Sequence, residues 1–155
     1  MQFIIRKLDQ GTDFNVDISD CDNMGDLHEK LKTEYGFGDS DFEVISGASD
    51  DADFFAKGRF LDQRVFEFQD LDEHSQKVVL AWIEEVGGDE SVEKILQLLL
   101  SYDNDRDGML DTLMSFFSIP EEIERFIDKD AVYREGQIIY QIVRFRDEYF
   151  IFNRN

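Results

Sequence analysis

The chain has 155 residues, and its 36 acidic and 16 basic residues give a formal net charge of −20 at pH 7. This charge argues against a nucleic-acid binder, which presents a basic face, and against electrostatic attraction to anionic membranes. Hydrophobic residues make up 42% of the chain and 15 residues are phenylalanine, which is enough for a core. The composition therefore predicts a folded acidic protein whose partner has a strongly basic surface.

Cys21 is the only cysteine, so no disulfide can form within the chain. Chains of this kind are typical of a reducing compartment. The N-terminal residues lack the apolar run of a signal peptide, and no apolar stretch approaches the length of a membrane span. We therefore expect a cytosolic protein.

Residues 1–45 predict a small α+β unit, because alternating apolar residues indicate strands and helical spacing indicates one helix. Its expected elements are strands at 3–8, 14–18 and 42–45 and a helix from Met24 to Tyr35. Asp20 or Asp22 is the expected N-cap of that helix. Residues 46–58, rich in Asp, Ser and Gly, are expected to form a loop that Phe54 and Phe55 pin to the fold.

The middle of the chain predicts mainly helices. Residues 60–68 are expected to be irregular or short-stranded. A helix capped by Asp72 or Ser75 then runs to Val86, and Gly87-Gly88 ends it. A second helix opens at Asp89 or Ser91, and its apolar residues, which continue to Leu100, predict that it is largely buried.

The C-terminal part predicts two helices followed by two strands. A helix is expected over 110–117, and residues 118–121 have the pattern of a capping box that starts a helix bearing Ile123, Phe126 and Ile127. The strands are expected at 138–145 and 149–152, with a hairpin turn at 146–148.

These elements predict the α+β class in an elongated three-part chain. Its expected parts are an acidic α+β domain at 1–57, a helical middle domain at 58–100, and a C-terminal domain at 101–155 with helices and an antiparallel β-hairpin. Residues 131–155 carry a net charge of +1. Because two copies of an acidic protein repel least where the field is weakest, this aromatic segment is a candidate homodimer contact. The alternative is that it consists of core strands.

The acid is concentrated in the stretch from Asp9 to Asp53, which contains 14 carboxylates and only two lysines, a net charge of −12. The same stretch carries apolar residues that a disordered acidic tail lacks. The sequence therefore predicts that these acidic side chains belong to a folded segment.

The size of the charge permits mimicry of DNA. B-form DNA carries one negative charge per roughly 1.7 Å of its axis, so 20 charges correspond to about 34 Å of duplex, or about ten base pairs. We therefore hypothesise an inhibitor that enters the DNA groove of another protein. The candidate phosphate-mimicking carboxylates are Asp13, Asp17, Asp20, Asp22, Asp26, Asp39, Asp41, Asp50, Asp51, Asp53, Asp62, Asp70, Asp72, Glu73, Glu84, Glu85, Asp89 and Glu90.

Two alternatives remain. The segment beginning at Asp103 matches an EF-hand loop at Asp105, Asp107 and Gly108, but position twelve is Met114 where a bidentate Glu belongs. The first alternative is therefore a calcium-responsive module. The second is an acidic chaperone or adaptor for basic proteins.

Catalysis has little support in the sequence. The two histidines, His28 and His74, belong to no recognisable catalytic pattern, and zinc-ligand spacing is absent. Gly36-Phe37-Gly38 is too short for a phosphate loop and no Lys follows it. We expect neither an enzyme nor a cofactor or metal site.

The segment from 120 to 135 resembles the antirestriction protein (ArdA) family. The matching residues are Pro120, Ile123, Phe126-Ile127-Asp128, Ala131 and Arg134-Glu135. A looser likeness covers residues 14–31, 41–45 and 66–86, the last including Trp82. The resemblance implies an elongated, acidic, homodimeric DNA mimic of phages and mobile elements. It implies that many carboxylates together occupy the DNA groove of type I restriction–modification enzymes, and that the segment after Asp103 is not a metal site.

Overall fold

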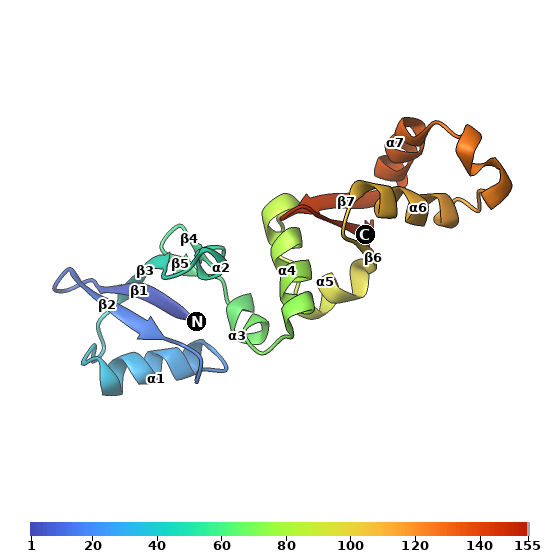
Figure 1. The fold of residues 1–155 in the computed structure, drawn as a ribbon. Coiled ribbons are helices and arrows are strands. Elements are labelled where there is room, and N and C mark those ends of the chain that lie inside the picture. The colour runs from blue at the N-terminus through green and yellow to red at the C-terminus, as the bar shows by residue number, and fades with distance from the viewer. Residues whose placement is uncertain (155) are drawn as a thin grey trace. The chain divides into compact units, whose positions relative to one another are not determined.

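The computed structural model describes residues 1–154 and has the predicted α+β class, with helices and antiparallel sheets (Figure 1). The chain divides into two compact units, unit 1 at residues 1–76 and unit 2 at residues 77–155. The predicted domain boundaries after residues 57 and 100 stay predictions. No helix within residues 1–154 is long and apolar enough to cross a membrane.

Unit 1 is built on a three-stranded antiparallel sheet of order β2-β1-β3, formed by β1 (Gln2–Lys7), β2 (Thr12–Asp17) and β3 (Phe42–Gly47). Alternation along β1 sends Phe3 and Ile5 into the core, because successive strand residues face opposite sides. On the opposite face, Arg6 lies between Asp13 of β2 and Glu43 of β3. The predicted strands are confirmed, with acid on the polar face.

Helix α1 (Met24–Glu34) packs on the apolar face of this sheet through Leu27 and Leu31, which are buried. The prediction of its N-cap was wrong: the cap is Asn23, whose side chain accepts from the backbone N–H of Asp26. The Asp26 carboxylate in turn accepts from the backbone N–H of Asp22. The two side chains satisfy N–H groups at the start of the helix, with Asp26 reaching the residue before the cap.

Residues 46–58 are not the simple loop that their composition predicts. They contain a helical turn, α2 (Asp50–Asp53), capped by Ser49, and the short strand β4 (Ala56–Lys57), which pairs with β5 (Phe60–Leu61). Phe55 is fully buried, as expected of a residue that pins the segment. Gly47 is needed here, because a Cβ on it would come within 2.3 Å of the backbone nitrogen of Asp53.

Residues 64–68 form helix α3 (Arg64–Phe68) rather than irregular structure, and Val65, Phe66 and Phe68 are buried. Gln69 then ties the helix to the preceding part of unit 1, because its side-chain amide donates to the carbonyls of Ile18 and Cys21. Helix α4 (Glu73–Glu85) follows as predicted, with Asp72 accepting from the backbone N–H of Ser75. The division between the two units falls within α4.

Helix α5 (Val92–Leu98) is capped by Ser91, one of the two expected caps, but it is shorter than predicted. Leu99 and Leu100 belong to strand β6 (Leu99–Asp103), and Leu100 is 45% exposed. The apolar run was misread as one helix because a continuous apolar segment has no distinguishing period. Gly87 and Gly88 end α4 as expected, both with positive φ, a conformation that glycine adopts without strain.

The sheet of unit 2 has the order β6-β8-β7, formed with β7 (Tyr140–Phe145) and β8 (Glu148–Asn153). The predicted hairpin is confirmed, with Arg146 and Asp147 both at positive φ in its two-residue turn. The third strand, β6, was not predicted. It places β8 at the centre of the sheet, where Phe150, Ile151 and Phe152 are all fully buried.

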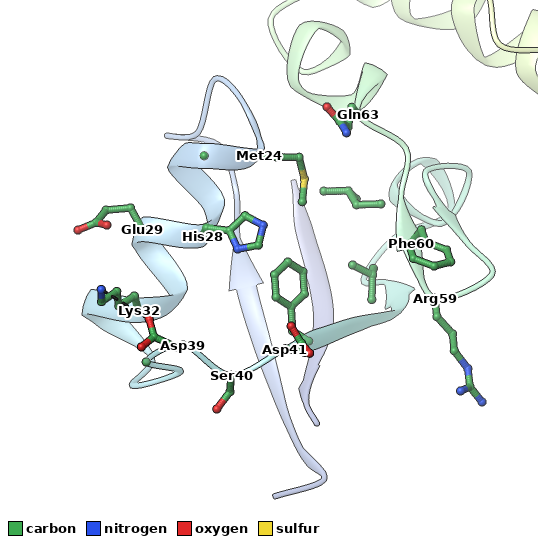
Figure 2. Close-up of a pocket in the computed structure, with 15 residues that line it drawn as sticks. Met24, His28, Glu29, Lys32, Asp39, Ser40, Asp41, Arg59, Phe60 and Gln63 are labelled. Atoms are coloured by element: carbon green, nitrogen blue, oxygen red, sulfur yellow. Dashed lines mark ion pairs between the residues drawn. The ribbon is translucent and has the colours of Figure 1, made fainter. Parts of the chain in front are cut away.

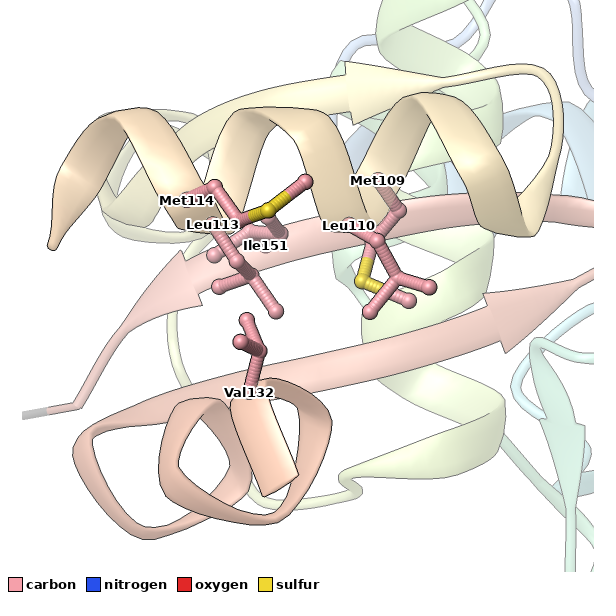
Figure 3. Close-up of a cluster of buried hydrophobic side chains, with 6 residues drawn as sticks. All are labelled: Met109, Leu110, Leu113, Met114, Val132 and Ile151. Atoms are coloured by element: carbon pink, nitrogen blue, oxygen red, sulfur yellow. The ribbon is translucent and has the colours of Figure 1, made fainter. Parts of the chain in front are cut away.

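One face of this sheet is covered by helix α6 (Arg106–Phe116) and helix α7 (Lys129–Ile139) (Figure 3). Met109, Leu113 and Met114 of α6 meet Val132 of α7 and Ile151 of β8 in one buried cluster. On β8, Phe152 also makes an edge contact with Trp82 of α4, their ring centres 5.0 Å apart. Both faces of β8 are therefore packed.

The segment between α6 and α7 differs from the prediction. Pro120 precedes a 3-10 helix, η1 (Glu121–Phe126), without a side-chain cap, so the predicted capping box does not form. Phe126 is 73% exposed, and no residue of η1 is buried. Ile138 and Ile139 end α7 instead of starting a strand.

Candidate partner-binding surface

Negative charge is spread over both units. Unit 1 holds 19 acidic and seven basic residues, a net charge of −12, and unit 2 holds 17 and nine, a net charge of −8. The predicted carboxylates lie between residues 13 and 90, so the structure distributes them over unit 1 and the first part of unit 2. Their surroundings divide them into three groups.

The first group is neutralised by ion pairs inside the chain. Arg6 donates two hydrogen bonds of 2.7 and 3.1 Å to Asp13, and these lower the pKa of that carboxyl group. Lys30 donates to Asp20 at 2.6 Å and likewise lowers its pKa. These carboxylates present little net charge to a partner. The group also includes Asp17 beside the N-terminal amine, Asp39 at 3.9 Å from Lys32, and Asp62.

Asp62 is the clearest structural carboxylate among the candidates. Its side chain is only 16% exposed and lies 2.6 Å from Arg64. Burial raises the pKa of Asp62, but hydrogen bonds from the side chain and backbone of Arg64 outweigh this, so the net shift is downward. The interpretation of Asp62 as a surface phosphate mimic is therefore corrected: it holds the start of α3.

The second group satisfies polar groups of the fold. Asp72 caps α4, and Asp26, in the first turn of α1, accepts from the backbone N–H of Asp22. Asp53 accepts from the backbone N–H of Gly47, and half-buried Glu90 accepts from the indole N–H of Trp82 at 3.1 Å. Removing one of these side chains would leave a donor without its partner, so their first role is structural.

The third group projects into solvent. These side chains are exposed and make no ion pair or side-chain hydrogen bond within residues 1–154: Asp22, Asp41, Asp50, Asp70, Glu73, Glu84, Glu85 and Asp89. Half-buried Asp51 has interactions and lies outside this group. The eight exposed carboxylates are the part of the predicted site that is free to meet a partner.

Helix ends explain why the fold tolerates so much acid. Within residues 1–154, twelve carboxylates lie in the first turn of a helix, three of them in α2 and three in η1. The N-terminus of a helix carries partial positive charge, so acids there are stabilised. Local structure thus offsets part of the repulsion that a net charge of −20 creates.

The calcium alternative meets a geometric obstacle. Helix α6 begins at Arg106, where an EF-hand would still be a loop, and Asp105 is its N-cap, accepting from the N–H of Gly108 at 2.7 Å. Thr112 donates to the Asp103 carboxylate at 3.2 Å. Within residues 1–154 no group of three or more His, Cys, Asp or Glu side chains is arranged to hold a metal.

One concave feature of unit 1 was missed by sequence reasoning. A cleft of about 530 Å³ lies between α1, β3 and the β4–β5 hairpin (Figure 2). Met24 and His28 enter it from α1, and the ring centre of His28 lies 5.1 Å from that of Phe42. Phe60, on the hairpin, is 78% exposed. A sequence signal for it was Phe60, an aromatic residue directly after the turn residues Gly58-Arg59.

Comparison with protein-family models finds no match to this chain, and comparison with curated proteins finds no significant relative.

Proposed function

We propose that this chain is a DNA-mimic inhibitor that occupies the DNA-binding groove of type I restriction–modification enzymes in the host cytoplasm. The observation that carries the proposal is the third group of carboxylates: eight exposed acids, four on helices and four in turns or loops, without partners inside residues 1–154. They belong to a chain of net charge −20. Acids held on folded units meet a basic groove at a lower ordering cost than acids on a disordered tail.

The set of carboxylates that we propose as the contact with the groove is smaller than the set predicted from the sequence. Carboxylates that already pair with Arg or Lys, such as Asp13 and Asp20, contribute little to attraction at a distance. The exposed group extends from Asp22 to Asp89 and therefore draws on both units. We propose that this group, assisted by the acids at helix N-termini, meets the basic groove.

We also propose that the inhibitor acts as a homodimer through the C-terminal part of the chain. The aromatic residues of β8, which motivated this contact, are buried in unit 2. Exposed apolar side chains lie instead on η1 and α7: Ile123, Phe126, Ile138 and Ile139. We propose that these exposed side chains contribute to the contact with a second copy, because exposed apolar surface favours association.

The test is a competition assay. A labelled duplex is bound to a type I methyltransferase core, the protein is added, and displacement is followed by fluorescence anisotropy. A polyglutamate of equal charge is the control. Near-stoichiometric displacement by the protein alone supports a mechanism in which the fold positions the charge. Equal behaviour of protein and polyglutamate, or no displacement, contradicts it, and preference for basic proteins of any shape would favour the chaperone alternative.

Charge-removing variants sharpen the test. Changing Asp70, Glu73, Glu84 and Glu85 together to their amides should weaken binding about tenfold or more, because each exposed charge contributes roughly 0.2–1 kcal/mol. The salt dependence of binding should fall in parallel. The single change Asp70→Asn should have only a small effect. Complete loss of inhibition in this folded single variant would contradict a distributed contact.

A further inference from the structure

We infer that the cleft of unit 1 is an anchoring site for an apolar side chain carried on a basic segment of a partner protein. The inference rests on the proposed function in one respect, namely that the partner presents a basic surface. It adds a short-range contact to a mechanism otherwise based on long-range charge.

The cleft is lined by both polar and apolar side chains, and its apolar part includes aromatic rings. Figure 2 shows Met24 and His28 pointing from α1 toward the β4–β5 hairpin. Phe60 is carried by this hairpin, across the cleft from α1. Phe42, Val44 and Leu61 complete the apolar lining. Single exposed apolar residues are common, but here Phe60 adjoins other apolar side chains around a cavity of about 530 Å³. The volume is within the range of sites that bury small groups.

The hairpin wall is held in place by backbone contacts. The N–H of Val44 donates to the carbonyl of Arg59 at 3.1 Å, which joins the hairpin to the edge of the sheet. Arg59 itself has a φ of 75°, a conformation that is costly for a residue with a side chain. The backbone is therefore strained in the turn that immediately precedes Phe60. The hairpin side of the cleft is in place without a bound partner.

The charges around the cleft favour a basic occupant. Its two cations already have acidic neighbours: Lys32 lies 3.9 Å from Asp39, and Arg59 lies 3.2 Å from Glu43. Glu29 and Asp41, also at the cleft, make no ion pair or side-chain hydrogen bond within residues 1–154. Since unit 1 carries a net charge of −12, a segment rich in Lys and Arg complements its rim.

An apolar anchor would supply what exposed carboxylates lack. Surface charges accelerate and orient an encounter, but each adds little free energy and is screened by salt. A few apolar contacts in a fitted pocket usually dominate the affinity of an interface. The cleft would therefore let this protein distinguish one basic groove from another.

The first experiment uses the full chain and two capped peptides, Lys-Lys-Phe-Lys-Lys and Lys-Lys-Ser-Lys-Lys, with methionine methyl groups observed by NMR. The Met24 methyl signal should shift saturably with the Phe peptide and not with the Ser peptide. The signals of Met109 and Met114, buried in unit 2, should not move. A Met24 shift that is equal for both peptides, or absent for both, overturns the inference.

The second experiment compares Phe60→Ala with the control Leu100→Ala, a change in unit 2 at a residue that does not line the cleft. Phe60 is 78% exposed and Leu100 is 45% exposed, so both variants should fold. Phe60→Ala should weaken binding of the Phe peptide at least about tenfold, and Leu100→Ala should leave it unchanged. Equal affinities of the two variants would contradict the inference.

The two proposals can fail separately. If the wild-type protein displaces DNA from the methyltransferase core but Met24 does not respond to the Phe peptide, the cleft inference is wrong and DNA mimicry stands. If Met24 responds selectively but no DNA is displaced, the cleft binds basic apolar segments and the proposed target is wrong.

Discussion

The two units contain sheets of the same size that differ in how far their two faces are buried. In unit 1, β1 alternates, with Phe3 and Ile5 in the core and Arg6 among the acids of the polar face. In unit 2, the central strand β8 buries Phe150, Ile151 and Phe152 in succession, so both faces are packed. A sheet with one solvent-exposed face can carry charged side chains on that face. In a sheet that is covered on both faces, the exposed charged side chains lie on helices and loops instead.

This difference predicts which substitutions lower the stability of the protein most. Phe152→Ala should destabilise unit 2 by about 4 kcal/mol, because it leaves a cavity beside Trp82 in a packed centre. Urea denaturation followed by far-UV circular dichroism, which reports on both units, measures this loss. Ile45→Ala in unit 1 is the control: Ile45 is 38% exposed, so the loss should be below about 1 kcal/mol. Similar losses in the two variants would refute the contrast between the sheets.

A smaller effect on stability is expected to distinguish carboxylates that bond to the fold from exposed carboxylates without a partner. Asp26→Ala should cost about 1 kcal/mol of stability, because it leaves the backbone N–H of Asp22 without its acceptor and removes one acid from the first turn of α1. Asp22→Ala, in the same exposed segment, should change stability little, because it keeps its backbone N–H and loses only an unpartnered carboxylate. Thermal unfolding of both variants checks this. If Asp22→Ala is the more damaging, the division into groups is wrong.

The smallest expected effect concerns pH. The folded-state pKa of Asp62 lies below its ordinary value, because the hydrogen bonds from Arg64 outweigh the opposing effect of burial. Its contribution to stability is therefore present above the unfolded pKa, about 3.9, and is lost as the pH falls through the folded pKa. Asp62→Asn should lose stability relative to wild type at pH 7, and the difference should shrink below about pH 4. Chemical denaturation at several pH values measures it.

Strong local patterns were sufficient to predict several elements. The α+β class, the strands near residues 3–8 and 14–18, α1, α4 and the final hairpin follow from periodicity and turn residues. The total charge and its concentration before Asp53 are likewise properties of composition. These features depend on neighbours in the chain, so the sequence alone was enough to find them.

Other features depended on contacts between distant residues. Leu99 and Leu100 continue an apolar run, yet Leu99 pairs with Phe152 of β8 and Leu100 lies in the irregularity that follows, so both belong to β6. Asp62 and Asp70 look alike in sequence, but only the tertiary structure decides that one pairs with Arg64 in a half-buried site while the other projects into solvent. The cleft beside Phe60 arises in the same way, because α1, β3 and the hairpin meet only after folding. Sequence determined how much charge this protein carries, and tertiary structure decided which carboxylates remain free to use it.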